Sequence, residues 1–281
     1  MITKYRRILL FILLVAASIS GIVFLSCNVD HGLEPLPGQL NLSVYFRNEP
    51  PQNTQGIYLM VAPIFPPHAI NEVYHSPNSL PIDQDTVRHQ IYLPYGHYDA
   101  LALWWYSTET ESNLADVLAI PIDYTAGLRP LGFDITPEEP VKNIELIANW
   151  AKVDRDASIE GTIYFDGSFP EDTQIVAVAA FKSEPLEPID YLLQLKSIDF
   201  SIDENENPYK FKLPVRSGSV NYVGVYWLAD RAGIGDFKPV GEYKDPEDPT
   251  RPGRLSLEPN DVAKGVDIYV EWSSALQSET Q

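Results

Sequence analysis

The sequence predicts an all-β protein made of two tandem, approximately seven-stranded β-sandwich domains behind an N-terminal export signal. Three observations lead to this prediction. Apolar and polar residues alternate with a period of two, turn formers (24 Pro and 16 Gly among them) interrupt the apolar runs, and the second half of the chain repeats the first. A sustained apolar stripe of period 3.6, which an amphipathic helix needs, is missing from the sequence.

The first 27 residues have the pattern of an export signal. Three basic residues (Lys4, Arg6 and Arg7) precede an uncharged stretch from 8 to 25, and Ser26 stands before the only cysteine, Cys27. The end of this segment, Phe24-Leu25-Ser26-Cys27, resembles a bacterial lipoprotein signal. The resemblance implies that signal peptide 1–26 is removed and that Cys27 is lipidated. Two alternatives are an uncleaved membrane anchor, which needs about 20 apolar residues, and plain secretion.

The remaining chain divides by composition and by repetition. We expect the lipidated Cys27 and a tether over 27–37, one β-sandwich over 38–150, a second over 157–273, and a frayed tail over 274–281. Residues 152–156 read as a short charged hinge between the sandwiches. Asn28 follows the cysteine where an Asp would resemble an inner-membrane retention signal, so the expected destination is the outer membrane.

The internal repeat rests on four ordered matches at offsets of about 120 residues. The longest aligns 136–150 with 258–272 and brings Pro, Lys and Trp into register, ending on Trp150 and Trp272. The shorter matches align 44–46 with 163–165, 91–94 with 211–214, and 129–130 with 251–252. Two copies of one structural unit are therefore expected.

Strand patterns recur within each copy. The first strand alternates Leu40, Leu42 and Val44 with Asn41 and Ser43, so one of its faces should be buried. The continuous apolar runs 57–62 and 175–181 fit central strands, and the last strand of each copy alternates again at 144–150 and 266–272. Only 191–195 suggests a helical turn.

The second copy resembles a known domain family. Its segments Gly161-Thr162-Ile163-Tyr164-Phe165, Tyr209-Lys210-Phe211-Lys212-Leu213-Pro214 and 236–243 are similar to bacterial transthyretin-like, carboxypeptidase-regulatory-like domains. The resemblance implies a seven-stranded, prealbumin-like sandwich that serves as an accessory or structural module. Some members of this family carry an Asp/Asn-rich loop where this chain has 230–236, but Ala232 and Ile234 stand at positions that need oxygen ligands.

Charge and motifs exclude several functions. The formal net charge of −19 argues against nucleic-acid binding, and a single cysteine excludes a disulfide framework. No catalytic constellation or phosphate-binding motif occurs, so we expect no enzyme activity and no cofactor. The acidic run 203–207 has calcium-loop spacing but continues into Pro208 and Pro214 at positions that need Gly and a carboxylate, and the histidines lack ligand spacing. No metal site is expected.

One strand in each copy carries aromatic rings on both of its faces. Leu101, Leu103 and Trp105, like Val223, Val225 and Trp227, should face the core. The opposite face alternates rings with small residues, which leaves shallow grooves able to stack sugars or accept a partner. If this face is open, the expected ligand-binding residues are Tyr98, Trp104, Tyr222 and Tyr226. The alternative is burial of this face under a loop, under the other domain, or in the core.

These observations favour a non-enzymatic, lipid-anchored cell-envelope protein with a structural, assembly or adhesion role. Its expected partners are the membrane, through the N-terminal lipid, and an envelope protein or glycan. The alternative is a carbohydrate-binding surface lipoprotein that uses exposed aromatic residues.

Overall fold

The computed structural model describes residues 38–67, 70–108, 113–125, 128–187, 189–230 and 236–275. The predicted signal peptide, the lipidation of Cys27, the tether and all but the first residues of the predicted tail lie outside this range. Within it, no helix has both the length and the apolarity needed to span a membrane. The protein is all-β, as the sequence predicts.

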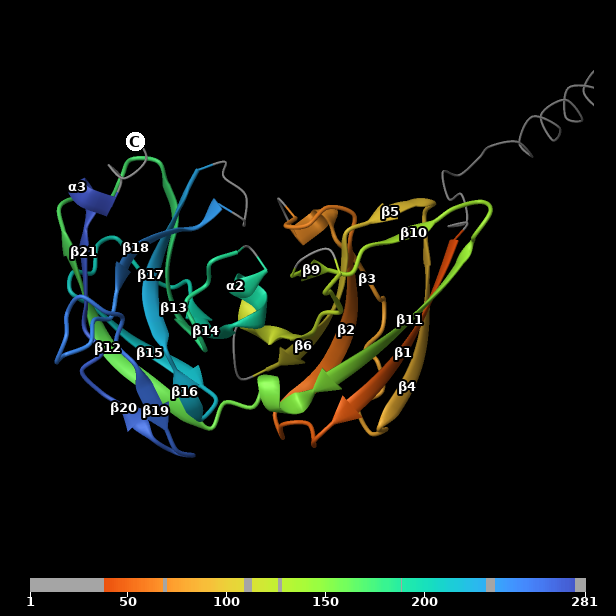
Figure 1. Cartoon of the computed structure of the whole chain (residues 1–281), viewed down its shortest axis with the longest axis horizontal. Coiled ribbons are helices and arrows are strands. Elements are labelled where there is room, and N and C mark those ends of the chain that lie inside the picture. The colour runs from red at the N-terminus through yellow and green to blue at the C-terminus, as the bar shows by residue number, and fades with distance from the viewer. Residues whose placement is uncertain are drawn as a thin grey trace, which may run out of the picture. The chain divides into compact units, whose positions relative to one another are not determined.

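The N-terminal half contains a three-stranded and a four-stranded sheet (Figure 1). The first has the order β11 (Val141–Asn149), β1 (Gly38–Arg47), β4 (Thr86–Leu93). The second has the order β3 (Tyr74–His75), β2 (Thr54–Ala62), β6 (Ala100–Ser107), β7 (Val117–Ala119). Short pairs and 3-10 turns complete this half: β5 (Gly96–Tyr98) with β10 (Phe133–Ile135), β8 (Ile122–Asp123) with β9 (Arg129–Pro130), and η2 (Ile70–Glu72), η3 (Leu114–Asp116) and η4 (Trp150–Lys152).

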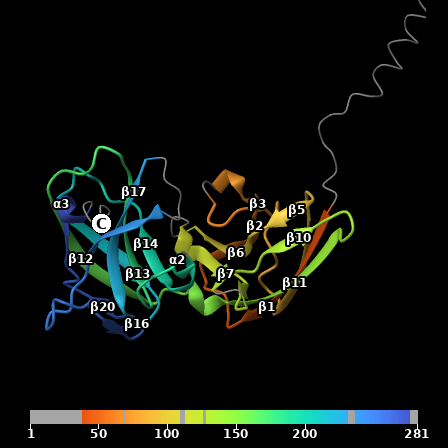
Figure 2. The ribbon, with the colours of Figure 1, turned by 45° about the horizontal axis from the view of Figure 1, so that its top comes forward.

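The C-terminal half repeats this arrangement (Figure 2). In its first sheet β12 (Ala157–Asp166) pairs with β15 (Tyr209–Val215), β20 (Val262–Ala263) and β21 (Ile268–Glu271). Its second sheet has the order β14 (Leu195–Asp199), β13 (Thr173–Phe181), β17 (Tyr222–Ala229), β18 (Lys238–Glu242). The remaining elements are β16 (Gly218–Val220), paired with β19 (Leu255–Leu257), and the single helical turns α2 (Asp190–Leu193) and α3 (Trp272–Ala275).

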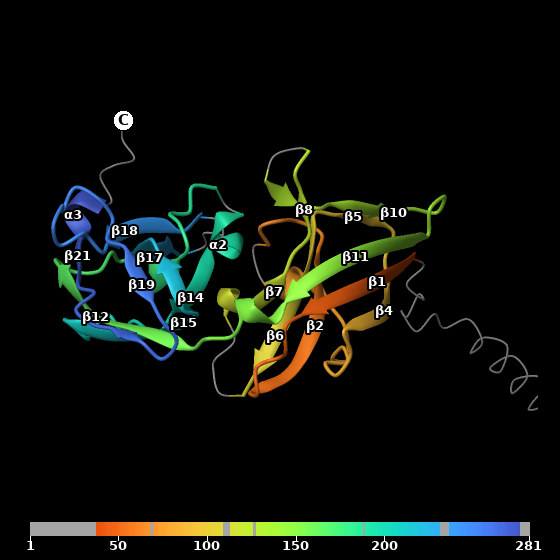
Figure 3. The same cartoon turned by 60° about the horizontal axis from the view of Figure 1, so that its bottom comes forward.

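Strand pairing is the same in the two halves. β1 runs antiparallel to β4 and parallel to β11, which lies beside it in Figure 3. In the same way, β12 runs antiparallel to β15 and parallel to β20 and β21. The matched sequence segments 44–46 and 163–165 fall in β1 and β12. Residues from Gly38 onward form one compact unit, so a division into independently folding domains at 38–150 and 157–273 stays a prediction.

The buried residues follow the predicted alternation. Leu40, Leu42 and Val44 of β1 are all 1% exposed or less. They pack with Leu101, Leu103 and Trp105 in one apolar cluster, and the equivalent Val223, Val225 and Trp227 lie in a second cluster. Trp150 and Trp272 are buried at the ends of the strands that precede them, stacked on Phe46 and Phe165 respectively. The core-facing side of each strand is thus the one that the sequence indicates.

Candidate functional site

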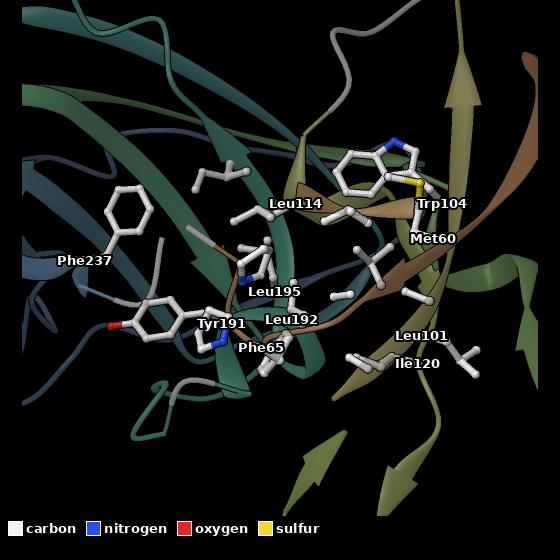
Figure 4. A pocket seen from close by; sticks show the side chains of 18 of the residues that line it. Met60, Phe65, Leu101, Trp104, Leu114, Ile120, Tyr191, Leu192, Leu195 and Phe237 are labelled. Carbon is white, nitrogen blue, oxygen red and sulfur yellow. The ribbon is translucent and has the colours of Figure 1, made fainter. Parts of the chain in front are cut away.

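An apolar cavity of about 140 Å³ lies where the two halves of the compact unit meet. We call it the junction cavity. Its walls come from β2 and β6 of the N-terminal half and from β13, α2, β14 and β17 of the C-terminal half. Figure 4 shows Trp104 and Met60 on one side of the cavity and Tyr191 and Phe237 on the other.

Small side chains leave room on the N-terminal wall. Ala100 and Ala102 of β6 line the cavity, and their strand partners on β2 are Ala62 and Met60. Trp104 comes next on the same face of β6. This is the face on which sequence alternation places small residues between large rings. Ala102 and Trp104 keep part of their surface accessible because they border this space.

A cluster of rings forms the C-terminal wall. Phe181, Tyr191 and Tyr226 meet edge to face, with ring centroids 5.6 to 5.9 Å apart. Edge-to-face packing is a favoured arrangement for such rings. Ala115 of η3, from the N-terminal half, belongs to the same buried cluster. Gly224 makes this packing possible, because a Cβ there would approach the Tyr222 ring to 2.7 Å.

The Tyr226 side chain is buried and hydrogen-bonded within the protein. Burial raises the pKa of Tyr226 far above its ordinary value, and a hydrogen bond between its side chain and that of Tyr222 adds to the shift. Burial also raises the pKa of Tyr222, whose side chain is hydrogen-bonded to Glu242. Both tyrosines are therefore neutral at physiological pH, and this wall of the cavity carries no phenolate.

The linker 152–156, predicted as a hinge, makes side-chain contacts with both halves. Arg155 Nη2 donates to Asp116 Oδ1 of η3 at 2.6 Å, and both side chains are less than a tenth exposed. The guanidinium also lies over the Trp105 ring, 5.5 Å from its centroid. Burial raises the pKa of Asp116, and the charge of Arg155 opposes that shift. These contacts attach the linker to the N-terminal half.

Two further linker side chains attach to the C-terminal half. Lys152 Nζ donates to the carbonyl of Leu192 in α2 at 3.1 Å, and burial lowers the pKa of Lys152 to about 8. Asp156 accepts hydrogen bonds from the backbone N–H and the hydroxyl of Ser217, at 2.6 and 2.9 Å. Partial burial raises the pKa of Asp156, but these hydrogen bonds outweigh it and the net shift is downward. The linker is thus anchored rather than free to bend.

The four aromatic residues predicted as an open ligand face have three different settings. Trp104 and Tyr226 line the junction cavity together. Tyr98 is buried, stacked on Phe133 with 5.2 Å between centroids, and its hydroxyl donates to the carbonyl of Pro94 at 2.7 Å. Tyr222 is buried against Phe181. Tyr98, Tyr222 and Tyr226 are thus buried, which is the alternative that the sequence left open, and neighbouring segments and the opposite half cover them.

A second, polar hollow of about 670 Å³ lies on the C-terminal half. Its lining includes Tyr222, Glu242, Asp245, Asp267 and Tyr269, and Lys244 forms an ion pair with Glu242 at its edge. Tyr269 is 72% exposed and stacks on Tyr164, its partner in the β12–β21 register, with 4.9 Å between centroids. Sequence reasoning missed this pair, because it depends on the pairing of two strands more than 100 residues apart.

An exposed histidine between two carboxylates was also missed. His97 Nδ1 lies 2.8 Å from Asp134 Oδ1, and its Nε2 lies 3.1 Å from Asp99 Oδ1. The hydrogen bond with Asp134 is the main cause that raises the pKa of His97. β5 and β10 bring His97 and Asp134 into register, so this pairing too depends on topology.

The acidic run 203–207, which has calcium-loop spacing, forms an ordinary turn. Asp203 Oδ1 accepts hydrogen bonds from the backbone N–H and the side-chain amide of Asn205, both at 2.8 Å. Across the described part of the chain, no group of three or more His, Cys, Asp or Glu side chains is placed to hold a metal ion. Residues 231–235 of the loop 230–236 lie outside the described residues.

Comparisons with known proteins give only remote similarities. No family model matches the chain, and no curated protein matches it. Among solved structures, a leucine-rich repeat protein from Bacteroides thetaiotaomicron aligns with 83% of this chain at 11% identity and a TM-score of 0.31, but this chain spans only 26% of that protein. A Bacteroides fragilis protein proposed to act in cell adhesion aligns over 81% of this chain and 91% of its own, at 10% identity and a TM-score of 0.27.

The minor pilin GBS52 of Streptococcus agalactiae aligns over 83% of this chain and 95% of its own length, at 8% identity and a TM-score of 0.24. The chain also spans about a third of the Bacillus anthracis TIE protein. All of these TM-scores lie well below 0.5, so none of these similarities indicates a function for this chain.

Proposed function

We propose that this chain is a non-enzymatic protein of the cell envelope, anchored in the outer membrane by a lipid on Cys27, with a structural, assembly or adhesion role. The observation that carries the proposal is the anchored linker. Arg155 attaches it to the N-terminal half, whereas Lys152 and Asp156 attach it to the C-terminal half. Because the linker is anchored, the two sandwiches can act as one rigid spacer between the membrane tether and a binding partner at the far end of the protein.

The chemistry of the junction agrees with a mechanical role. Breaking a buried, hydrogen-bonded ion pair by removing one partner costs about 3–5 kcal/mol, so the Arg155–Asp116 contact resists separation of the linker from the N-terminal half. The junction cavity is lined by aliphatic and aromatic side chains, which suit packing and binding rather than proton transfer.

Complementation of a deletion strain tests this function. The wild type should restore cell attachment and carry an acyl label, whereas Cys27→Ala should lose both the label and membrane retention. Arg155→Ala should remain in the membrane but fail to restore attachment, and Arg88→Ala, which removes an exposed arginine of β4, should restore it. Full attachment with Arg155→Ala would refute the spacer role, and an unlabelled but membrane-retained wild type would refute the lipid anchor.

The polar hollow favours a second candidate, carbohydrate binding. An exposed aromatic ring beside carboxylates can stack on a sugar and accept hydrogen bonds from its hydroxyls, and Tyr269 stands beside Asp245 and Asp267 in this way. Glycan-array binding should then fall about tenfold in Tyr269→Ala, as a lost contact of roughly 1.4 kcal/mol requires. The matched control is Tyr92→Ala, another exposed tyrosine outside the hollow. Equal binding by both variants would remove this candidate.

A further inference from the structure

We propose that the junction cavity is a binding site for a small, uncharged molecule built around one aromatic ring. The cavity has a volume of about 140 Å³. The junction cavity is partly open to solvent. An enclosed apolar cavity of about 150 Å³ takes up benzene or xenon, so the space here is also large enough for a single six-membered ring. This inference is independent of the envelope role proposed above.

The lining determines that the ligand is uncharged. Among the described residues, the side chains around the cavity are aliphatic, aromatic or proline, with the thioether of Met60, and none carries a carboxylate, ammonium or guanidinium group. Burial keeps the Tyr226 hydroxyl neutral, and Tyr222 already engages it. A charged ligand would lose its hydration without gaining a partner, whereas a hydrocarbon-like molecule loses little on leaving water.

The rings in the walls favour an aromatic ligand over an aliphatic one of similar volume. Trp104 and Phe65 come from the N-terminal half, and Phe181, Tyr191 and Tyr226 come from the C-terminal half. Aromatic pairs gain from offset and edge-to-face contacts beyond the area that they bury. Figure 4 shows Trp104 and Tyr191 on opposite sides of the space, so a ring placed between them meets aromatic surface from both halves.

Small side chains on the N-terminal wall create the space for the ligand. Ala100 and Ala102 of β6, with Ala62 beside them on β2, provide the space that larger side chains would fill. Leucine at position 102 would project into this space. The substitution Ala102→Leu therefore removes the site by filling it rather than by breaking a contact, and Ala263→Leu makes the same change on β20, outside the cavity.

Because the ligand touches both halves, its binding stabilises their assembled arrangement. A molecule that binds the native arrangement and not the unfolded chain raises the melting temperature as its concentration rises. Toluene serves as the aromatic probe and methylcyclohexane as its aliphatic counterpart. Each is titrated against the folded chain, with binding followed by calorimetry and by the shift in melting temperature.

The proposal predicts saturable toluene binding to the wild type and to Ala263→Leu, at least tenfold weaker binding to Ala102→Leu, and several-fold weaker binding of methylcyclohexane to the wild type. A crystal of the wild type under xenon pressure should show xenon between Trp104 and Tyr226, which tests the site even if Ala102→Leu does not fold. The proposal is overturned if the wild type binds no toluene saturably, if folded Ala102→Leu binds it equally well, if both hydrocarbons bind alike, or if xenon leaves the cavity empty.

Discussion

Trp104 and Tyr226 occupy equivalent positions in the two repeats and line the same cavity from opposite halves of the protein. Each follows a strand position that holds a small residue on the same face, Ala102 in β6 and Gly224 in β17. The two halves therefore meet through equivalent sheet faces. On the C-terminal half, aromatic rings fill the contact. On the N-terminal half, the small alanine side chains of β6 leave the cavity unfilled.

Trp150 and Trp272 should be the most costly single truncations in their respective halves. Each is almost fully buried and stacks on a phenylalanine of the first strand, Phe46 at 5.2 Å and Phe165 at 5.9 Å. Replacement of either by Ala should lower the free energy of unfolding by about 3–5 kcal/mol in urea denaturation, because a large cavity is left. Tyr124→Ala, at a residue that is 78% exposed, should change it by less than about 0.5 kcal/mol. Similar losses in all three variants would show that the two tryptophans are not core residues.

One indole hydrogen bond occurs in both halves. Trp105 Nε1 donates to Thr54 Oγ1 at 2.9 Å, and Trp227 Nε1 donates to Thr173 Oγ1 at the same distance. Thr54→Val and Thr173→Val keep the shape but leave a buried N–H without an acceptor, so each should cost about 1–3 kcal/mol. The Thr→Ser variants keep the oxygen and should lose clearly less stability. If Val and Ser substitutions prove equally costly, the methyl packing matters rather than the hydrogen bond.

The Arg155–Asp116 pair should behave as a buried ion pair. Arg155→Ala should lower the free energy of unfolding by about 3–5 kcal/mol, because it leaves the Asp116 carboxylate buried without its partner. The double variant Arg155→Met with Asp116→Leu should recover much of that loss, since two apolar side chains need no pairing. Lys212→Ala, which breaks an exposed pair with Glu160, is the control and should have little effect. A double variant less stable than Arg155→Ala would contradict this account.

His97 should titrate above its ordinary pKa of 6.5, because Asp134 and Asp99 favour its protonated form. A histidine whose pKa is raised on folding contributes stability below its unfolded pKa, and that contribution is lost as pH rises through the folded pKa. An NMR titration of the imidazole protons should therefore give a midpoint above 6.5 in the wild type. Asp134→Asn should lower the midpoint and Asp83→Asn should not. A wild-type midpoint at or below 6.5 would rule out the pairing.

The sequence determined which side of each strand is buried but not what covers the other side. Alternation in β6 and β17 correctly placed Trp105 and Trp227 in the cores, because a period of two assigns alternate residues to opposite faces. It could not show that Tyr226 meets Tyr191 of α2 and Ala115 of η3, because those short turns carry no periodic pattern. The anchored linker escaped prediction for a different reason, because the partners of Arg155 and Asp156 lie 39 and 61 positions away in the sequence.

The central claim is that the two sandwiches act as one unit through the linker and the rings around the junction cavity. Differential scanning calorimetry of the chain from residue 28 onward tests it most directly. The account predicts one transition whose calorimetric and van't Hoff enthalpies agree, and two resolved transitions in Arg155→Ala. Two independent transitions in the wild type, unchanged by Arg155→Ala, would contradict it.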